Sequence, residues 1–330
     1  MSYPFSSEDM AVFEPTFFHE MSRDLMTSFK KIFFLLLCFL PLGVCAEAPL
    51  KVVSSFSILS DLIREVGGHH ITVQTIVGAN EDTHVYEPTP KDAQHLAEAD
   101  LVFINGLGFE GWIERLIESS GYKGDVIVAA KDIHPRHDLQ SCACSQGNHA
   151  HSSSKIDPHS WHNIPNVKSY ITIIEKALSN KDPLHQKDYA HNAALYQKKL
   201  NLLDKKIQNN FSTIPKDKRI SITTHDGFGY FGDHYGIRFL SPVGLSTGAE
   251  PSAKTIAHLV DFIKDHHIKI LFLENIASSK LMQQIASETG ARLGPVLYSD
   301  ALSDEKGPAS TYLKMMEHNA QTLRQGMQLQ

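Results

Sequence analysis

The stretch LHQKDYAHNAALYQKKLNLLDKKIQNNFSTI, residues 184–214, contains neither glycine nor proline. Its apolar residues recur every three or four positions, at Tyr189, Ala193, Tyr196, Leu200, Leu203, Ile207 and Phe211. This spacing places them on one face of an α-helix, and about 27 residues would extend roughly 40 Å. We therefore predict a linking helix within residues 183–214 that runs along the back of two lobes and restricts hinge motion. The alternative is a surface helix within a single domain.

Short apolar runs alternate with helical patterns on both sides of this helix. The predicted strands are Lys51–Phe56, Ile71–Val77, Leu101–Ile104, Val126–Ala129, Ile220–Thr223, Ile237–Leu240, Ile268–Leu273 and Leu293–Tyr298. The predicted helices between them are Ile58–Val66, Pro90–Ala99, Trp112–Glu118, Ala253–His266 and Lys280–Thr289. Such alternation is typical of βαβ units with mainly parallel sheets. We predict an α/β fold with an N-terminal lobe over residues 47–182 and a C-terminal lobe over 215–330, each with a four-stranded sheet flanked by helices.

The first 46 residues have the pattern of a secretory signal. Lys30 and Lys31 precede the apolar run Ile32–Leu40, and Val44-Cys45-Ala46 supplies a small-residue cleavage site. The run is too short to span a bilayer stably. We expect translation to start at Met26, cleavage after Ala46, and a periplasmic protein that does not insert in the membrane. A lipoprotein signal with an anchor at Cys45 is the alternative.

Charge and cysteine content exclude several classes of function. The first 46 residues carry five acidic and three basic side chains, so the net charge of −6 becomes −4 without them. This chain lacks the basic balance that binding of nucleic acid or anionic lipid requires. Only Cys142 and Cys144 follow the signal, which excludes a long-range disulfide framework. We therefore expect no nucleic-acid partner.

Residues 134–155 are polar and rich in histidine and cysteine. The side chains that could bind metal are His134, His137, Cys142, Cys144, His149 and His151. Their neighbours are mostly Ser, Gln, Asn and Gly, so we expect a surface loop. Such tracts bind borderline cations weakly, and the loop either collects metal for a deeper site or is a tolerated insertion.

Three histidines and one aspartate are the candidate metal ligands. The histidines are those of Asp82-Thr83-His84-Val85-Tyr86, Asp157-Pro158-His159-Ser160-Trp161 and Thr224-His225-Asp226-Gly227-Phe228, and the fourth ligand is Asp300. Imidazole nitrogen and carboxylate oxygen are donors that zinc takes in tetrahedral sites. The four residues lie far apart in sequence, two in each predicted lobe. Because loops after parallel strands face the crevice where ligands bind, we expect them to meet between the lobes.

The remaining histidines are expected to be solvated or hydrogen-bonded. These are His69, His70, His95, His185, His191, His258, His266, His267 and His318, and also His162 and His234 near the candidate ligands. A secreted zinc hydrolase is a competing hypothesis, with Glu110 or Glu274 as its general base. Such an enzyme needs an open coordination position, and the chain has no His-Glu-x-x-His motif. We therefore predict a protein that is not an enzyme.

Several motifs resemble the cluster A-I solute-binding proteins, the metal receptors of ABC importers, and the zinc-uptake branch most of all. They include Ser55–Leu59, the His84 motif with Pro88–Asp92, Ala99–Glu110, Asp157–Trp161, Asn192–Tyr196, the His225 motif through Gly236, and Asp300–Leu302 before Tyr312. Two features depart from the family pattern: Thr83 stands where proline is common, and His162-Asn163 replaces a usual Leu-Asp.

The resemblance implies a fold, a site and a function. The fold is two α/β lobes joined by a rigid helix, with one metal ion held in the cleft by His84, His159, His225 and Asp300. The function is that of a monomeric receptor that captures Zn²⁺ and delivers it to the membrane permease of a zinc ABC importer. Manganese and iron receptors of the family often carry glutamate where this chain has His225, although some three-histidine members are linked to manganese. A manganese or iron receptor is therefore the alternative. Separately, related zinc receptors can use water or another carboxylate at the position of Asp300.

Overall fold

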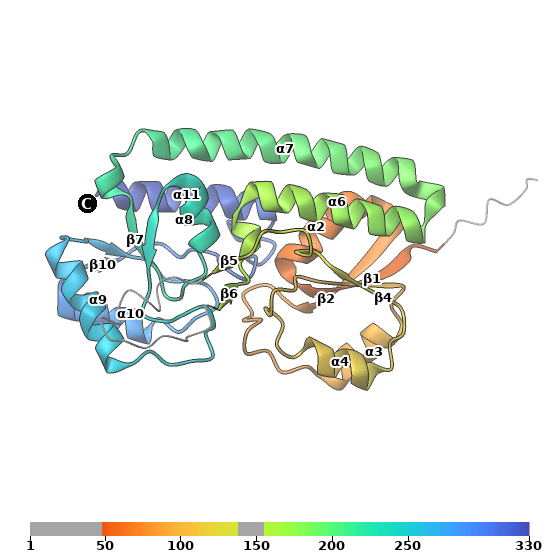
Figure 1. Cartoon of the computed structure of the whole chain (residues 1–330), viewed down its shortest axis with the longest axis horizontal. Coiled ribbons are helices and arrows are strands. Elements are labelled where there is room, and N and C mark those ends of the chain that lie inside the picture. Colours follow the sequence, from red (N-terminus) through yellow and green to blue (C-terminus); the bar gives the residue numbers. More distant parts are fainter. Residues whose placement is uncertain (1–47, 138–154, 330) are drawn as a thin grey trace, which may run out of the picture. The chain divides into compact units, whose positions relative to one another are not determined.

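Two α/β lobes make up the part of the chain that the structure describes. The computed structural model describes residues 48–137 and 155–329, and Pro49–Gln330 form one compact unit. Each lobe contains a four-stranded parallel sheet with helices on both faces (Figure 1). The predicted α/β class, with four strands in each lobe, is confirmed.

The N-terminal sheet has the strand order β2-β1-β3-β4. Its strands are β1 Leu50–Phe56, β2 Ile71–Val77, β3 Leu101–Ile104 and β4 Asp125–Val128. Its helices are α2 Ser57–Gly67, α3 Pro90–Ala97, α4 Ile113–Ser120 and α6 Ile164–Lys181. Helices α2 and α6 lie on the side of the sheet that faces the long helix, and α3 and α4 lie on the other (Figure 1).

The C-terminal sheet has the strand order β10-β9-β7-β8. Its strands are β7 Ile220–Ile222, β8 Arg238–Leu240, β9 Ile270–Leu271 and β10 Arg292–Leu293. Its helices are α8 Gly229–Tyr235, α9 Ala253–Asp265, α10 Lys280–Thr289 and α11 Tyr312–Gln328. The last two strands are shorter than predicted, and β10 ends before Gly294 and Pro295, where proline has no N–H for a ladder. Beyond it, only an isolated bridge from Glu274 to Leu297 continues the pairing.

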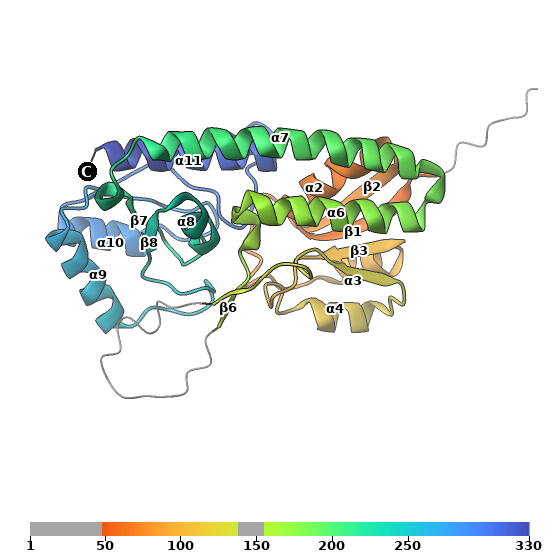
Figure 2. The ribbon, with the colours of Figure 1, turned by 45° about the horizontal axis from the view of Figure 1, so that its top comes forward.

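The long helix α7, Gln186–Ser212, packs against elements of both lobes. All seven apolar residues that predicted its inner face are buried. It contacts α2 and α6 of the N-terminal lobe and α8 and α11 of the C-terminal lobe, and it spans both lobes in two views (Figures 1 and 2). Each buried large apolar side chain contributes about 1.5–3 kcal/mol. The helix is therefore fixed to both lobes, as predicted, while the predicted domain limits stay a prediction.

Two short strands and four 3-10 turns complete the described chain. Strands β5 Arg136–His137 and β6 Ile156–Asp157 pair antiparallel, and the residues between them, 138–154, lie outside the described residues. The 3-10 turns are Gly68–His70, Ser160–His162, Pro183–His185 and Lys216–Lys218. Within residues 48–137 and 155–329, no helix is both long and apolar enough to cross a membrane. The predicted signal, residues 1–46, also lies outside the described residues.

Candidate metal centre

The four candidate ligands converge on one point between the lobes. The Nε2 atom of His159 lies 3.2 Å from that of His84 and 3.3 Å from that of His225. Asp300 Oδ2 lies 3.3 Å from both His84 Nε2 and His225 Nε2, and Oδ1 lies 3.6 Å from His159 Nε2. Across residues 48–137 and 155–329, this is the only group of three or more His, Cys, Asp or Glu side chains close enough to hold a metal ion.

These separations match the edges of a tetrahedron around a small divalent cation. Donor atoms about 2.0–2.2 Å from a central zinc ion would lie about 3.3–3.6 Å apart at its corners. With one atom from each ligand, the four separations among the three Nε2 atoms and Asp300 Oδ2 are 3.2 or 3.3 Å. The 3.6 Å separation from His159 is to the second carboxylate oxygen, Oδ1. The donor set therefore fits four-coordinate binding by three nitrogens and one oxygen.

His84 lies in the loop that follows β2, and its neighbours fix that loop. Its backbone N–H donates to Asp82 Oδ1 at 2.9 Å, and Trp112 Nε1 donates to the carbonyl of Thr83 at 2.9 Å. The Phe109 ring stands edge-on to the imidazole, with centroids 4.9 Å apart. The His84 side chain is 5% exposed, whereas the other three ligand side chains are fully buried. His84 is therefore the candidate ligand nearest to solvent.

His159 follows β6 and is oriented by Asp157. Asp157 Oδ1 accepts from the backbone N–H of His159 at 3.0 Å and from its Nδ1 at 2.8 Å. An imidazole that donates from Nδ1 keeps its Nε2 lone pair for a metal, and a carboxylate partner raises its basicity. The aspartate of the motif thus has a role in orientation that sequence reasoning did not assign.

His225 follows β7 and is held in the same way by Glu274. Glu274 Oε1 accepts from the His225 backbone N–H at 2.9 Å, and Oε2 accepts from Nδ1 at 2.5 Å. Gly227 lies under the ring, where an added Cβ would lie 2.6 Å from Cε1. Glycine is therefore required two residues after this candidate ligand.

Asp300 is placed by the aromatic residues beneath it. Trp161 Nε1 donates to the carbonyl of Ser299 at 2.8 Å, and Tyr312 Oη donates to the carbonyl of Trp161 at 2.8 Å. Within the described part of the chain, the carboxylate of Asp300 has no donor near it except the ligand imidazoles, with His84 Nε2 and His225 Nε2 3.3 Å from Oδ2. A fully buried carboxylate in that state requires a cation nearby, and a metal ion would supply it.

The charges of the site act in opposite directions on Asp300 and His225. Burial favours the neutral form of Asp300, but the His225 and His159 imidazoles outweigh it and hold the pKa of Asp300 well below its usual value. Burial opposes a charge on His225, yet Glu274 and Asp300 raise the pKa of His225 well above its usual value. Without a metal ion, the charges around His225 therefore favour its protonated form.

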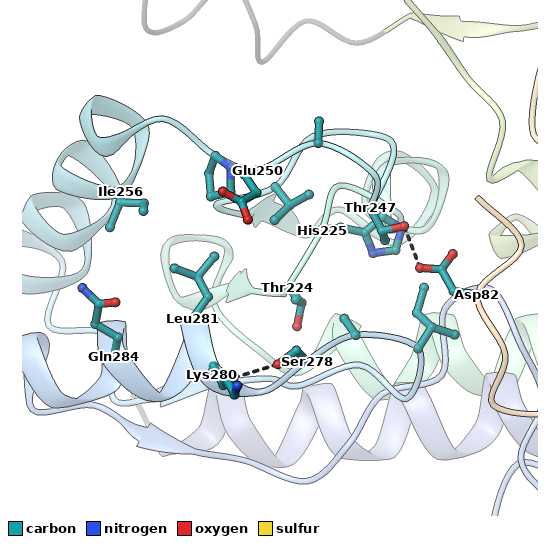
Figure 3. A pocket seen from close by; sticks show the side chains of 15 residues that line it. Asp82, Thr224, His225, Thr247, Glu250, Ile256, Ser278, Lys280, Leu281 and Gln284 are labelled. Carbon is teal, nitrogen blue, oxygen red and sulfur yellow. Dashed lines mark hydrogen bonds between the residues drawn. The ribbon is translucent and has the colours of Figure 1, made fainter. Parts of the chain in front are cut away.

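A cavity of about 510 Å³ adjoins His225 in the C-terminal lobe (Figure 3). Its other lining residues include Thr224, Val243, Lys280 and Leu281. At its edge, Thr247 Oγ1 of the C-terminal lobe donates to Asp82 Oδ2 of the N-terminal lobe at 2.6 Å, the upper dashed line in Figure 3. Because Asp82 also holds His84, this hydrogen bond joins a candidate ligand loop to the opposite lobe.

The other residues considered from sequence lie outside the four-ligand group. The expectation that His162 is solvated or hydrogen-bonded is wrong, because the residue is fully buried and neither ring nitrogen has a hydrogen-bond partner in the described chain. Its ring packs on Phe228 with centroids 4.6 Å apart, and burial lowers its pKa to about 3. Glu110 is buried and accepts from Ser55 Oγ and from the Asn105 N–H, both at 2.6 Å. Glu110 and Glu274 are thus engaged in holding other groups. His234 binds Asp204, and none of the histidines expected to be solvated or hydrogen-bonded joins the metal group.

The histidine-rich segment is only partly described. His134 and His137 are described and do not belong to the metal group. Cys142, Cys144, His149 and His151 lie outside the described residues, so metal collection by this segment stays a prediction.

Comparison with known proteins identifies relatives along most of the chain. Residues 52–326 match the family model described as "Zinc-uptake complex component A periplasmic". The manganese-binding lipoprotein MntA of Halalkalibacterium halodurans is 32% identical over 278 residues, which cover 84% of this chain and 88% of that protein. The iron-binding protein YfeA of Yersinia pestis is also 32% identical, with coverage of 84% and 86%.

Solved structures show the same fold. The Mn-bound periplasmic metal binding protein of Candidatus Liberibacter asiaticus has a TM-score of 0.72 and 29% identity, and the match covers 84% of this chain and 98% of that one. The periplasmic zinc binding protein TroA of Treponema pallidum has a TM-score of 0.76 at 24% identity, with coverage of 85% and 99%. The chain belongs to the family of periplasmic components A of zinc-uptake complexes, the metal-binding solute-binding proteins of ABC importers.

Proposed function

We propose that this protein captures Zn²⁺ between its lobes and delivers it to the membrane permease of a zinc ABC importer. In this proposal His84, His159, His225 and Asp300 each give one donor atom to the ion. The observation that carries it is the spacing of the three Nε2 atoms and Asp300 Oδ2, with four separations of 3.2 or 3.3 Å. The ion is the cargo of transport, and the protein acts as a monomeric receptor without catalysis.

The chemistry of the donors favours zinc. Zinc takes imidazole and carboxylate ligands in four-coordinate sites, whereas manganese prefers oxygen donors and octahedral geometry. Three nitrogens and one oxygen, on side chains that are at most 5% exposed, suit a four-coordinate zinc site. The two carboxylate-backed imidazoles add basicity, which strengthens bonds to a borderline cation.

Manganese is the second candidate cargo, and iron the third. Two of the relatives named above are a manganese-binding lipoprotein and an iron-binding protein. A manganese ion would need more donors than one from each of the four side chains. The second oxygen of Asp300, 3.6 Å from His159 Nε2, and water from the adjoining cavity would have to provide them. The distinction is therefore one of coordination number.

Delivery requires that the permease disturb a buried site. A cation held by four deprotonated side chains leaves slowly without such help. We propose a periplasmic location after cleavage at Ala46, with anchoring through Cys45 as the alternative. Mass spectrometry of the mature N-terminus distinguishes a free Glu47 from a lipid-modified cysteine.

Competition for zinc tests the proposal. Metal-free protein is titrated with Zn²⁺ or Mn²⁺ against a chromogenic chelator, and His84→Ala, His225→Ala and Asp300→Asn are compared with wild type. We expect the histidine variants to lose about 100-fold or more in zinc affinity, because loss of a direct ligand exceeds the 10- to 100-fold cost of losing its supporting partner. His258→Ala, an exposed residue of α9, is the matched control.

Two results would contradict the proposal. Unchanged zinc affinity in His225→Ala would exclude the site. Tighter binding of Mn²⁺ than of Zn²⁺ by the wild type, together with a six-coordinate Mn²⁺ signal in electron paramagnetic resonance, would make manganese the cargo.

A further inference from the structure

Arg136 of β5 makes polar contacts with two different segments. Its Nη1 donates to Asp157 Oδ2 at 3.0 Å, and its Nε donates to Asp233 Oδ2 at 2.9 Å. Its backbone N–H donates to Tyr230 Oη at 2.8 Å. The side chain is 16% exposed, so the guanidinium lies largely inside the protein. An arginine can serve two carboxylates at once because its donors form a rigid planar fork.

The first of these segments carries His159. Asp157 is fully buried, and each of its two carboxylate oxygens has a different hydrogen-bond partner. Oδ1 holds the Nδ1 and the backbone N–H of His159, while Oδ2 accepts from Arg136. Without Arg136, Oδ2 would lose this charged donor, and rotation of the carboxylate would carry Oδ1 away from His159.

The second segment continues from His225. Tyr230 and Asp233 belong to α8, Gly229–Tyr235, which begins four residues after that candidate ligand. Gly229 gives Arg136 room, because an added Cβ would lie 2.3 Å from Nη1 and 2.7 Å from Asp157 Oδ2. The position of the Arg136 guanidinium therefore depends on the absence of a side chain at Gly229 of α8.

The second carboxylate-backed histidine has no such partner. Among residues 48–137 and 155–329, no lysine or arginine forms an ion pair with Glu274. Glu274 reaches His225 from the loop after β9, within the same lobe. Only His159, of the two, is connected through a cation to the other ligand segment.

We propose that Arg136 is a positioning residue for metal capture, which ties the Asp157–His159 segment to α8 and so holds His159 and His225 at binding distance before the ion arrives. This inference rests on the proposed function. When no metal ion is present, the imidazoles lose the cation that holds them together, so a site that opened when empty would have to be ordered again at each capture. A fixed geometry avoids that cost.

Variants of the connection test this role. Arg136→Met removes both ion pairs, and Gly229→Ala places a methyl group where the guanidinium lies. We expect each to lower zinc affinity about 10-fold, the range for residues that orient a metal ligand. Arg115→Met, an exposed arginine of α4, and Gly111→Ala, where an added Cβ meets nothing within 4 Å, are the matched controls.

Two further variants separate positioning from charge. Arg136→Lys keeps the charge but cannot serve both carboxylates in the fork geometry, so we expect only partial recovery of affinity. Asp233→Asn removes the ion pair to α8 and leaves both the ion pair to Asp157 and the backbone hydrogen bond to Tyr230. We expect a loss of about 3-fold that is not additive with Arg136→Met, because both variants remove the same ion pair. The Co²⁺-loaded Arg136→Met protein should also show shifted and weaker visible absorption, because tetrahedral geometry is distorted.

The outcomes separate this inference from the proposed function. If wild type binds zinc and His225→Ala does not, but Arg136→Met and Gly229→Ala stay within 2-fold of wild type, Arg136 has no positioning role. Equal losses in Arg115→Met and Gly111→Ala would overturn it as well, as would full recovery in Arg136→Lys. Thermal unfolding of each metal-free variant identifies any that fails to fold, and Asp233→Asn, which alters an exposed carboxylate, then decides the outcome. Failure of wild type to bind zinc would refute the proposed function instead.

Discussion

Glu274 holds His225 at two points, with one carboxylate oxygen on its backbone N–H and the other on its Nδ1. This arrangement fixes both the position of the ring and the nitrogen that carries the proton. The imidazole therefore presents Nε2 to the centre in a single orientation.

Replacing Glu274 by glutamine should weaken zinc binding about 10- to 100-fold. The amide keeps the size of the side chain but removes the charge that makes His225 basic. Isothermal titration in the presence of a competing chelator measures the change. Glu288→Gln, on the exposed side of α10, is the control, and equal affinities for the two variants would show that the carboxylate has no role in binding.

Zinc affinity should rise with pH across the neutral range. The pKa of His225 is raised by Glu274 and Asp300 against the effect of burial, so the metal-free protein carries a proton there at pH values where an ordinary histidine is neutral. Zinc must displace this proton, so the apparent affinity should fall about 10-fold for each pH unit below the raised pKa.

The proton released on binding can be counted directly. Titrations in buffers of different ionisation enthalpy give the number of protons lost at each pH. Release of about one proton at pH 7 in wild type, with less in His225→Ala, is the expected result. No release from wild type at pH 7 would show that His225 is already neutral.

Thr247→Val should speed the loss of zinc without removing any ligand. The substitution keeps the shape of the side chain but breaks the hydrogen bond to Asp82, which also holds the His84 backbone. A bond of this kind to a charged group, partly open to water, is worth about 1 kcal/mol, or about 5-fold in rate. Stopped-flow mixing with a chelator measures it, and Ser246→Ala is the neighbouring control. A rate of zinc release equal to that of wild type would show that the hydrogen bond between Thr247 and Asp82 does not slow release.

Asp61 should make the metal-free protein less stable as pH rises from about 4 to 6. Burial raises the pKa of Asp61 from 3.8 to about 6, against the hydrogen bond from the Tyr312 N–H. Because the pKa of Asp61 is higher in the folded than in the unfolded protein, its protonated form adds to the free energy of unfolding below about pH 4. This stabilisation is lost as the pH passes about 6.

Asp61→Asn should remove this dependence. The free energy of unfolding of the variant, relative to wild type, should increase by about 2–3 kcal/mol between pH 4 and pH 7. Urea unfolding at several pH values in the presence of a chelator gives the difference. Asp265→Asn, on the exposed face of α9, should show none of it, and parallel pH curves for Asp61→Asn and wild type would contradict the assignment.

Most of the fold could be predicted from sequence because the strands are separated by clear helical patterns. Strands Ile71–Val77 and Leu101–Ile104 and helix Lys280–Thr289 were predicted at the limits that the structure has. Helices α6 and α11 were not predicted, although α6 buries Ile164, Val167, Ile171, Ile174 and Leu178 at helical spacing. The two-residue strands β5 and β6 carry too little pattern to be seen.

The convergence of the four candidate ligands could be predicted because each histidine lies in a distinctive motif. The groups that support them could not be predicted in the same way. Arg136 lies 21 residues from Asp157 and 97 from Asp233, and only the folded chain brings the three together. The same holds for Glu274, which is 49 residues from His225.

The long helix α7 also limits how this protein can be used as a sensor. A pair of fluorophores attached at the far ends of the lobes would report little, because the rod between them keeps that separation nearly constant whether cargo is bound or absent. A single environment-sensitive dye near Thr247 would instead report local rearrangement at the edge of the cavity beside His225. A biosensor derived from this protein should therefore carry one dye at the edge of that cavity, and should not rely on energy transfer between dyes on the two lobes.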